Sequence, residues 1–139
     1  NCAIYCGASV DFVDIDPDSF NMCPNLLKEK LIEAKKNNSL PKIVIPVHFA
    51  GNPCDLKEIY ELSRKYGFKI IEDASHFVGS KLKSKYVGAC IYSDISVFSF
   101  HPVKIITTGE GGIILTNKKS LNDRQKILHL TYNEILQFI

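Results

Sequence analysis

The sequence carries little net charge and no long apolar run, and each absence excludes a class of partner. Of its 139 residues, 17 are Lys or Arg and 15 are Asp or Glu, so the formal net charge is only +2. Proteins that bind nucleic acid or an anionic membrane through charge need a basic stripe or block, and neither is present. No apolar run approaches the roughly 18 residues that span a bilayer, and no basic-then-apolar leader opens the sequence. We therefore expect neither nucleic acid nor membrane as a partner.

Two further motif classes are missing. The five cysteines form no Cys-x-x-Cys pair, so the sequence gives no support to a zinc or redox motif. Cys2 and Cys6 fall in an apolar segment and are expected to be small core residues. Scattered cysteines, odd in number, indicate a reducing compartment, so we expect a cytoplasmic protein. No Gly-x-Gly-x-x-Gly run joins a first strand to a helix, which argues against a dinucleotide-binding Rossmann domain.

What the sequence does contain is the pattern of a single α/β domain. It is 45% apolar and 23% charged, as in ordinary globular proteins, and it has no internal repeat or linker. Apolar, β-rich pieces alternate with helical pieces, which predicts a mainly parallel sheet flanked by helices. The predicted strands are 3–5, 10–15, 43–47, 68–72, 95–99 and 112–116.

Three helices and one hairpin are predicted between and after these strands. Apolar residues at helical spacing follow Pro24, and Asn37 and Asn38 end that helix. A second helix is predicted from Asp55 to Tyr66, with Gly67 ending it, and a third from Ser120 to about Leu130. Residues 81–86 are predicted to form a small exposed hairpin.

One lysine stands out because of its surroundings. Lys104 follows the apolar run 95–100 in the segment Ser-Phe-His-Pro-Val-Lys and precedes Thr-Thr-Gly-Glu-Gly-Gly at 107–112. Burial at a strand end would leave its charge poorly solvated, and a neutral amine can attack a carbonyl to form a Schiff base. The alternative is an ordinary surface lysine in a loop, which is the commoner place for this residue type.

A carboxylate at the end of another predicted strand gives this lysine a partner. Asp73 ends the run Ile-Ile-Glu-Asp at 70–73, and ligands of open α/β sheets bind at the carboxyl ends of the strands. Such a pair suits pyridoxal phosphate (PLP), because lysine carries the aldehyde while the carboxylate keeps the ring nitrogen protonated. A helix N-cap or a metal ligand are alternative roles for Asp73.

Four ordered segments carry a family resemblance: 13–16 (Val-Asp-Ile-Asp), 45–51 (Ile-Pro-Val-His-Phe-Ala-Gly), 71–76 (Ile-Glu-Asp-Ala-Ser-His) and 99–104. Between about Asn1 and Leu130, the sequence resembles the DegT/DnrJ/StrS sugar aminotransferases of PLP fold type I. The form of 101–112 is most similar to the 4-keto-sugar aminotransferases of the pseudaminic acid pathway.

The resemblance implies a role for four side chains. Lys104 would attach the cofactor and move protons, and Asp73 would pair with the pyridinium nitrogen. His76 matches the polar residue beside the cofactor ring, often Gln, and Ser99 matches a hydroxyl donor to its phosphate. The plainer alternatives are a satisfied, partly buried His76, a Ser99 that bonds nearby backbone, and a 109–112 segment that is only a tight turn. His48 and His101 are weaker candidates for substrate contact.

The same resemblance implies what the whole protein does. It implies transfer of an amino group, usually from glutamate, to a nucleotide-linked 4-keto-6-deoxy sugar by a homodimer. Residues 1–139 would be the central part of the PLP-binding large domain, without an N-terminal segment and a small C-terminal domain. Two alternatives stay open: an inactive truncated fragment, and a PLP-dependent sugar dehydratase, in which histidine replaces the lysine.

Overall fold

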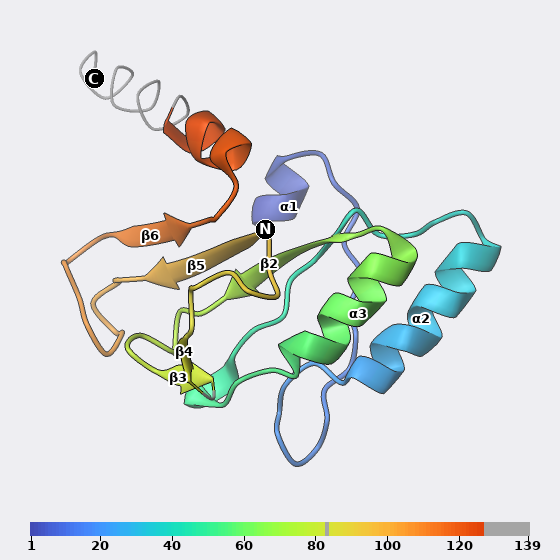
Figure 1. Cartoon of the computed structure of the whole chain (residues 1–139), viewed down its shortest axis with the longest axis horizontal. Coiled ribbons are helices and arrows are strands. Elements are labelled where there is room, and N and C mark those ends of the chain that lie inside the picture. Colours follow the sequence, from blue (N-terminus) through green and yellow to red (C-terminus); the bar gives the residue numbers. More distant parts are fainter. Residues whose placement is uncertain (83, 127–139) are drawn as a thin grey trace.

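A computed structural model describes residues 1–82 and 84–126, and its centre is a mainly parallel sheet (Figure 1). In the described part, β1 (Ile43–Val44), β2 (Lys69–Asp73), β5 (Ile95–Ser99) and β6 (Gly112–Leu115) lie in the order β1-β2-β5-β6. The first three strands are parallel, and β6 is antiparallel to β5. The predicted α/β class is therefore confirmed. Both β2 and β5 end at the same edge of the sheet.

Two helices cover one face of the sheet, with α3 packed against β2 (Figure 1). Helix α2 (Pro24–Lys36) begins with proline, whose missing N–H is not needed in a first turn. Helix α3 (Leu56–Tyr66) follows Asp55 and ends at Gly67, which has a left-handed φ of 84°. Apolar side chains from both helices, the sheet and the segments directly before α3 and β2 form the main core: Leu27, Leu31, Val44, Cys54, Leu56, Ile59, Phe68 and Ile70.

A smaller core lies nearer the carboxyl edge of the sheet. Ala74, Phe77 and Phe98 are buried there, with Phe100 and Leu115 packed against them. The predicted hairpin is present as β3 (Lys81–Leu82) and β4 (Lys85–Tyr86). Residues 119–126 are helical, in agreement with the predicted third helix, whose last residues lie outside the described part.

The first two predicted strands are wrong. Residues 3–5 belong to helix α1 (Cys2–Tyr5), a single turn that is followed by Gly7 at a φ of 71°. Residues 10–15 form no strand, apart from one bridge between Ile15 and Met22. Apolar, β-prone residues are not sufficient, because a strand needs a neighbour to bond. The core prediction for Cys2 and Cys6 is also wrong, because both are exposed.

The strand predicted at 43–47 is shorter than expected. Only Ile43–Val44 forms β1, and Val47 rejoins β2 through an isolated bridge to Asp73. Pro46 lies between them and has no N–H to donate, although its carbonyl accepts the N–H of Asp73 at 2.9 Å. The chain thus stays beside β2 up to its end. Within the described residues, none of the helices combines the length and apolar character needed to cross a membrane.

Candidate active site

Lys104 lies in a closed loop between β5 and β6, here called the lysine loop (residues 100–111; Figure 1). The N–H of Phe100 donates to the carbonyl of Gly111 at 2.8 Å, and that of Thr108 donates to the carbonyl of Phe100 at 3.1 Å. Inside the loop, the N–H of Lys104 donates to the carbonyl of His101 at 2.9 Å. The loop's ends are therefore held together, and Lys104 is presented at the carboxyl edge, partly buried.

The structure brings Lys104 directly to His76. The distance from Lys104 Nζ to His76 Nε2 is 3.0 Å, within hydrogen-bonding range, across 28 residues of sequence. His76 reaches this place because the chain turns sharply after β2. Asp73 Oδ1 accepts the N–H of Ser75 at 3.0 Å, and the N–H of Ala74 donates to the carbonyl of Val97 at 2.8 Å. No helix starts at Asp73, so it is not an N-cap.

Asp73 and Ser99 lie on the same face of the sheet. Asp73 is the register partner of Val97, and Ser99 is two residues further along β5. Because strand side chains alternate, Val97 and Ser99 share a face with Asp73, opposite the face covered by α2 and α3. Ser99 Oγ accepts the N–H of His101 at a long 3.4 Å, the plainer role expected for it. Among the described residues, Asp73 forms no ion pair with Lys104 or any other cation.

A buried pair supports this edge, and the sequence did not reveal it. His48 is fully buried, so it cannot line a substrate site. Its Nδ1 accepts the N–H of Cys54 at 3.0 Å, which leaves Nε2 facing Glu72 Oε2 at 3.5 Å. The backbone N–H of His48 donates to the carbonyl of Asp73 at 3.0 Å. Desolvation by burial raises the pKa of the adjacent Cys54 thiol to about 12, so this cysteine stays neutral.

The other weak candidate, His101, is exposed in the lysine loop, and its Nδ1 accepts the N–H of Val103 at 3.3 Å. His76 has a different neighbour. The ring of Phe49 meets the ring of His76 edge-on, with centroids 6.3 Å apart and an interplanar angle of 64°. Phe49 belongs to a short 3-10 turn, η1 (Phe49–Gly51), directly after His48.

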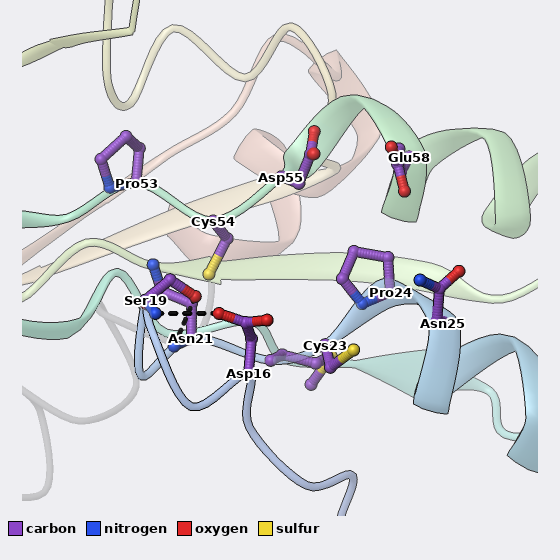
Figure 2. Close-up of a pocket in the computed structure, with 11 residues that line it drawn as sticks. Asp16, Ser19, Asn21, Cys23, Pro24, Asn25, Pro53, Cys54, Asp55 and Glu58 are labelled. Atoms are coloured by element: carbon purple, nitrogen blue, oxygen red, sulfur yellow. Dashed lines mark hydrogen bonds between the residues drawn. The ribbon is translucent and has the colours of Figure 1, made fainter.

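A hollow of about 480 Å³ lies elsewhere, beside the first turns of α2 and α3 (Figure 2). Asp16, Asn21, Cys54, Asp55 and Glu58 are among its lining residues. None of the four predicted cofactor residues lines it. In the described part of the chain, no three His, Cys, Asp or Glu side chains come close enough together to hold a metal ion.

Comparison with known families shows to which family the chain belongs. The sequence model described as the DegT/DnrJ/EryC1/StrS aminotransferase family matches residues 1–133. The chain belongs to this family. The resemblance inferred from the four motifs is therefore confirmed, and the paired strand ends belong to an aminotransferase fold.

Two curated relatives of this family member are nucleotide-sugar enzymes by name. The chain is 42% identical over 130 residues to UDP-4-amino-4,6-dideoxy-N-acetyl-beta-L-altrosamine transaminase of Campylobacter jejuni, covering 92% of the chain and 32% of the relative. It is 41% identical over 124 residues to GDP-perosamine synthase of Escherichia coli, covering 89% and 32%. The chain thus spans about a third of the length of these relatives.

Solved structures of family members share the fold. The aminotransferase PseC of Helicobacter pylori, involved in the biosynthesis of pseudoaminic acid, superposes with a TM-score of 0.78 at 33% identity, covering 89% of this chain and 31% of that one. A family aminotransferase from Brucella abortus gives a TM-score of 0.80 at 34% identity, covering 86% and 32%. The expected fold of a PLP-dependent aminotransferase is thereby confirmed over the matched region.

Proposed function

We propose that the protein carrying this chain is a PLP-dependent aminotransferase that acts on a nucleotide-linked keto-sugar. One observation carries the proposal. Lys104 presents a partly buried amine at the carboxyl edge of the sheet, 3.0 Å from His76 and beside the strand that ends in Asp73. Ligands of open α/β sheets bind at this edge.

The chemistry of the donor set fits PLP. Lys104 supplies an amine for the cofactor aldehyde, and Asp73 supplies a carboxylate that no cation neutralises among the described residues. Ser99, on the same face as Asp73, supplies a hydroxyl for the phosphate. Bound PLP supplies an electron sink for reaction at the carbon that carries the amino group.

Each residue has a separate task in this proposal. Lys104 binds the cofactor and takes or returns a proton at Nζ. Asp73 keeps the proton on the ring nitrogen by holding a negative charge beside it. The closed ends of the lysine loop limit where Nζ can lie, which favours one reactive geometry.

The substrate proposal depends on the names of the relatives. The Campylobacter transaminase is named for a UDP-linked dideoxy amino sugar, and the Escherichia coli protein for a GDP-linked amino sugar. We propose that the acceptor here is a nucleotide-linked 4-keto-6-deoxy sugar and that glutamate is the amino donor. The product would be an amino sugar used to build cell-surface glycans.

The proposal extends to the organisation of the protein. The chain matches about a third of its relatives' length, and we place residues 1–139 in the central part of the PLP-binding large domain. An N-terminal segment and a small C-terminal domain would lie outside it, and the complete enzyme would be a homodimer. The free cysteines, two of them exposed, support a reducing cytoplasm.

Two other functions remain as outcomes of the test. A sugar dehydratase of this family would carry histidine in place of Lys104, so the lysine favours amination. The second outcome is that the isolated 139-residue chain has no activity. Catalysis needs the reacting groups to be held in place to within about an ångström, and the chain alone would not hold them so.

The test follows cofactor attachment to one residue. The protein is mixed with PLP, reduced with borohydride and mapped by mass spectrometry. Wild type is compared with Lys104→Met and with a control, Lys36→Met, which changes an exposed lysine at the end of helix α2. We expect a reduced adduct at residue 104 in wild type and the control, and none in Lys104→Met. An adduct spread over surface lysines contradicts the proposal. Turnover of the keto-sugar to an amine, rather than to a dehydrated ketone, separates amination from dehydration.

A further inference from the structure

The structure contains a series of contacts that leads to the amine of Lys104 from a turn far away in the sequence. The turn is formed by residues 16–22 and is here called turn 16–22. It closes through two backbone hydrogen bonds of 2.9 Å, from Asp16 N–H to the carbonyl of Asn21 and from Phe20 N–H to the carbonyl of Asp16. Asp16 Oδ1 also accepts the N–H of Ser19 at 2.9 Å, as Figure 2 shows. The turn is therefore closed by hydrogen bonds among its own residues.

Asn21 connects this turn to the segment that carries Phe49. Its side chain is only 3% exposed, and both of its polar atoms are bonded. Oδ1 accepts the N–H of Phe49 at 2.9 Å, and Nδ2 donates to the carbonyl of Asn52 at 3.0 Å. These bonds hold both ends of η1, so the backbone of Phe49 is fixed by a residue 28 positions earlier.

The same turn also contacts the ring of Phe49. The ring of Phe20 lies 6.4 Å from it, at an interplanar angle of 47°. Phe20 adopts a φ of 57°, a conformation that bulky residues rarely take. Such strain persists only where surrounding contacts hold it, and here Phe20 keeps its ring near that of Phe49 although it is 56% exposed. Turn 16–22 thus constrains Phe49 through both backbone and ring.

The last two contacts reach the amine. The ring of Phe49 meets His76 edge-on, and His76 Nε2 lies 3.0 Å from Lys104 Nζ. An imidazole that is held on one side offers its ring nitrogen in one direction, whereas a free imidazole rotates about χ2. Phe49 thus contacts the ring that bonds the lysine amine.

We propose that turn 16–22 positions the amine of Lys104 by acting through Phe49 and His76. Phe49, Phe20 and Asn21 are positioning residues, since none of them contacts Nζ. The proposal rests on the proposed function only in taking Lys104 as the reacting amine.

The first experiment needs no cofactor. An amine-directed reagent labels the protein, and mass spectrometry compares the labelling rate of Lys104 with that of exposed Lys36. Loss of the hydrogen bond to His76 frees the amine, so we expect Lys104 to be labelled several-fold faster in His76→Ala and in Phe49→Leu. Phe49→Leu added to His76→Ala should change nothing further, because a residue that acts only through another has no effect once that residue is gone. Equal labelling in wild type and Phe49→Leu, or independent effects in the double variant, overturns the proposal.

A conservative pair separates positioning from general stability. Asn21→Asp keeps the acceptor for the Phe49 N–H but replaces the donor to Asn52 with a buried carboxylate oxygen, which destabilises the fold, whereas Asn21→Ala loses both bonds. We expect near-wild-type labelling of Lys104 in Asn21→Asp and faster labelling in Asn21→Ala. If labelling follows the thermal unfolding midpoint across the set instead, the role is only structural and the proposal fails.

The borohydride experiment then keeps the two proposals apart. A free reagent needs only an accessible amine, whereas a bound aldehyde needs an oriented one. If PLP attaches to Lys104 in wild type and attaches several-fold more slowly in both Phe49→Leu and His76→Ala, both proposals therefore stand. If it never attaches, the proposed function fails, while the cofactor-free labelling still decides the positioning role. If it attaches equally fast in all variants, the positioning role fails and the function stands.

Discussion

The helix-covered face of the sheet and its carboxyl edge differ in how they are built, and the difference separates stability from chemistry. Under α2 and α3, side chains such as Leu31, Ile59 and Ile70 are almost completely buried. In the lysine loop, by contrast, apolar residues are exposed to solvent: Val103 is 79% exposed and Ile105 is 75% exposed. Apolar burial is the largest favourable contribution to folding, so the helix-covered face stabilises the domain. The edge with Asp73, His76 and Lys104 is held mainly by backbone hydrogen bonds and turn geometry.

The largest expected effect on stability lies on the helix-covered face. Ile59 is completely buried in α3, and Ile59→Ala would remove apolar contacts and leave a cavity. We expect it to lower the free energy of unfolding by about 2–5 kcal/mol, measured by denaturant titration. Val103→Ala, in the exposed lysine loop, is the matched control and should change it by less than about 0.5 kcal/mol. Similar losses of unfolding free energy in the two variants would show that the helix-covered face and the lysine loop do not differ as described.

An intermediate effect is expected in the lysine loop itself. Gly111 has a φ of 157°, and a Cβ added to it would lie 2.4 Å from Thr108 Oγ1, which bonds the carbonyl of Glu110. Gly111→Ala must displace the side chain of Thr108. We expect this to disturb the two hydrogen bonds that close the lysine loop, from Phe100 N–H to Gly111 and from Thr108 N–H to Phe100, here called the clamp. We expect a cost of about 1–3 kcal/mol in unfolding free energy together with slower attachment of PLP to Lys104.

The matched control for this variant is Gly109→Ala. Gly109 also has a positive φ, of 81°, but no atom lies within 4 Å of its added Cβ. Gly109→Ala should therefore lower the unfolding free energy, because alanine is strained at a positive φ, while leaving the clamp closed. Unchanged attachment in Gly111→Ala would mean that the clamp does not control where the amine lies.

The smallest effect concerns an ion pair at the opposite edge of the sheet from the lysine loop, where β5 begins and β6 ends. Asp94 Oδ2 accepts the N–H of Ile70, at the helix-covered face, and Asp94 also pairs with Lys118, which follows β6. Burial alone would raise the pKa of Asp94, but the hydrogen bonds from Lys118 and Ile70 outweigh it, so the pKa lies below its ordinary value. A carboxyl with a lowered pKa adds stability above about pH 4, and this is lost as the pH falls through the folded-state value.

Asp94→Asn should remove that acid-dependent contribution. Because Lys118 is half exposed, we expect the unfolding free energies of wild type and Asp94→Asn to differ by at most about 1 kcal/mol near neutral pH. This difference should shrink as the solution is acidified below pH 4. Thermal unfolding across pH 2.5 to 7 measures it. If wild type and Asp94→Asn differ in stability by the same amount over that whole range, the charge of Asp94 contributes nothing to stability.

Several predictions from sequence succeeded because local chemistry was enough. Pro24, Asp55 and Gly67 lie at helix ends in the structure as expected, since helix starts and stops depend on a few neighbouring residues. The strands at β2 and β5 were located within one residue, because short apolar runs bounded by turns are buried in the middle of a sheet. The strand predicted at 3–5 failed for the opposite reason: pairing needs a distant partner, and residues 3–5 are helical instead.

The sequence by itself determined the fold class, the family and which lysine and aspartate to consider, because these depend on ordered motifs and on hydrophobic periodicity. Only the tertiary structure decided that His48 is buried against Glu72, that Asp73 and Ser99 share a face, and that Asn21 reaches His76 through Phe49. Contacts across tens of residues arise from the register of strands and the path of loops, which no local pattern of residues encodes.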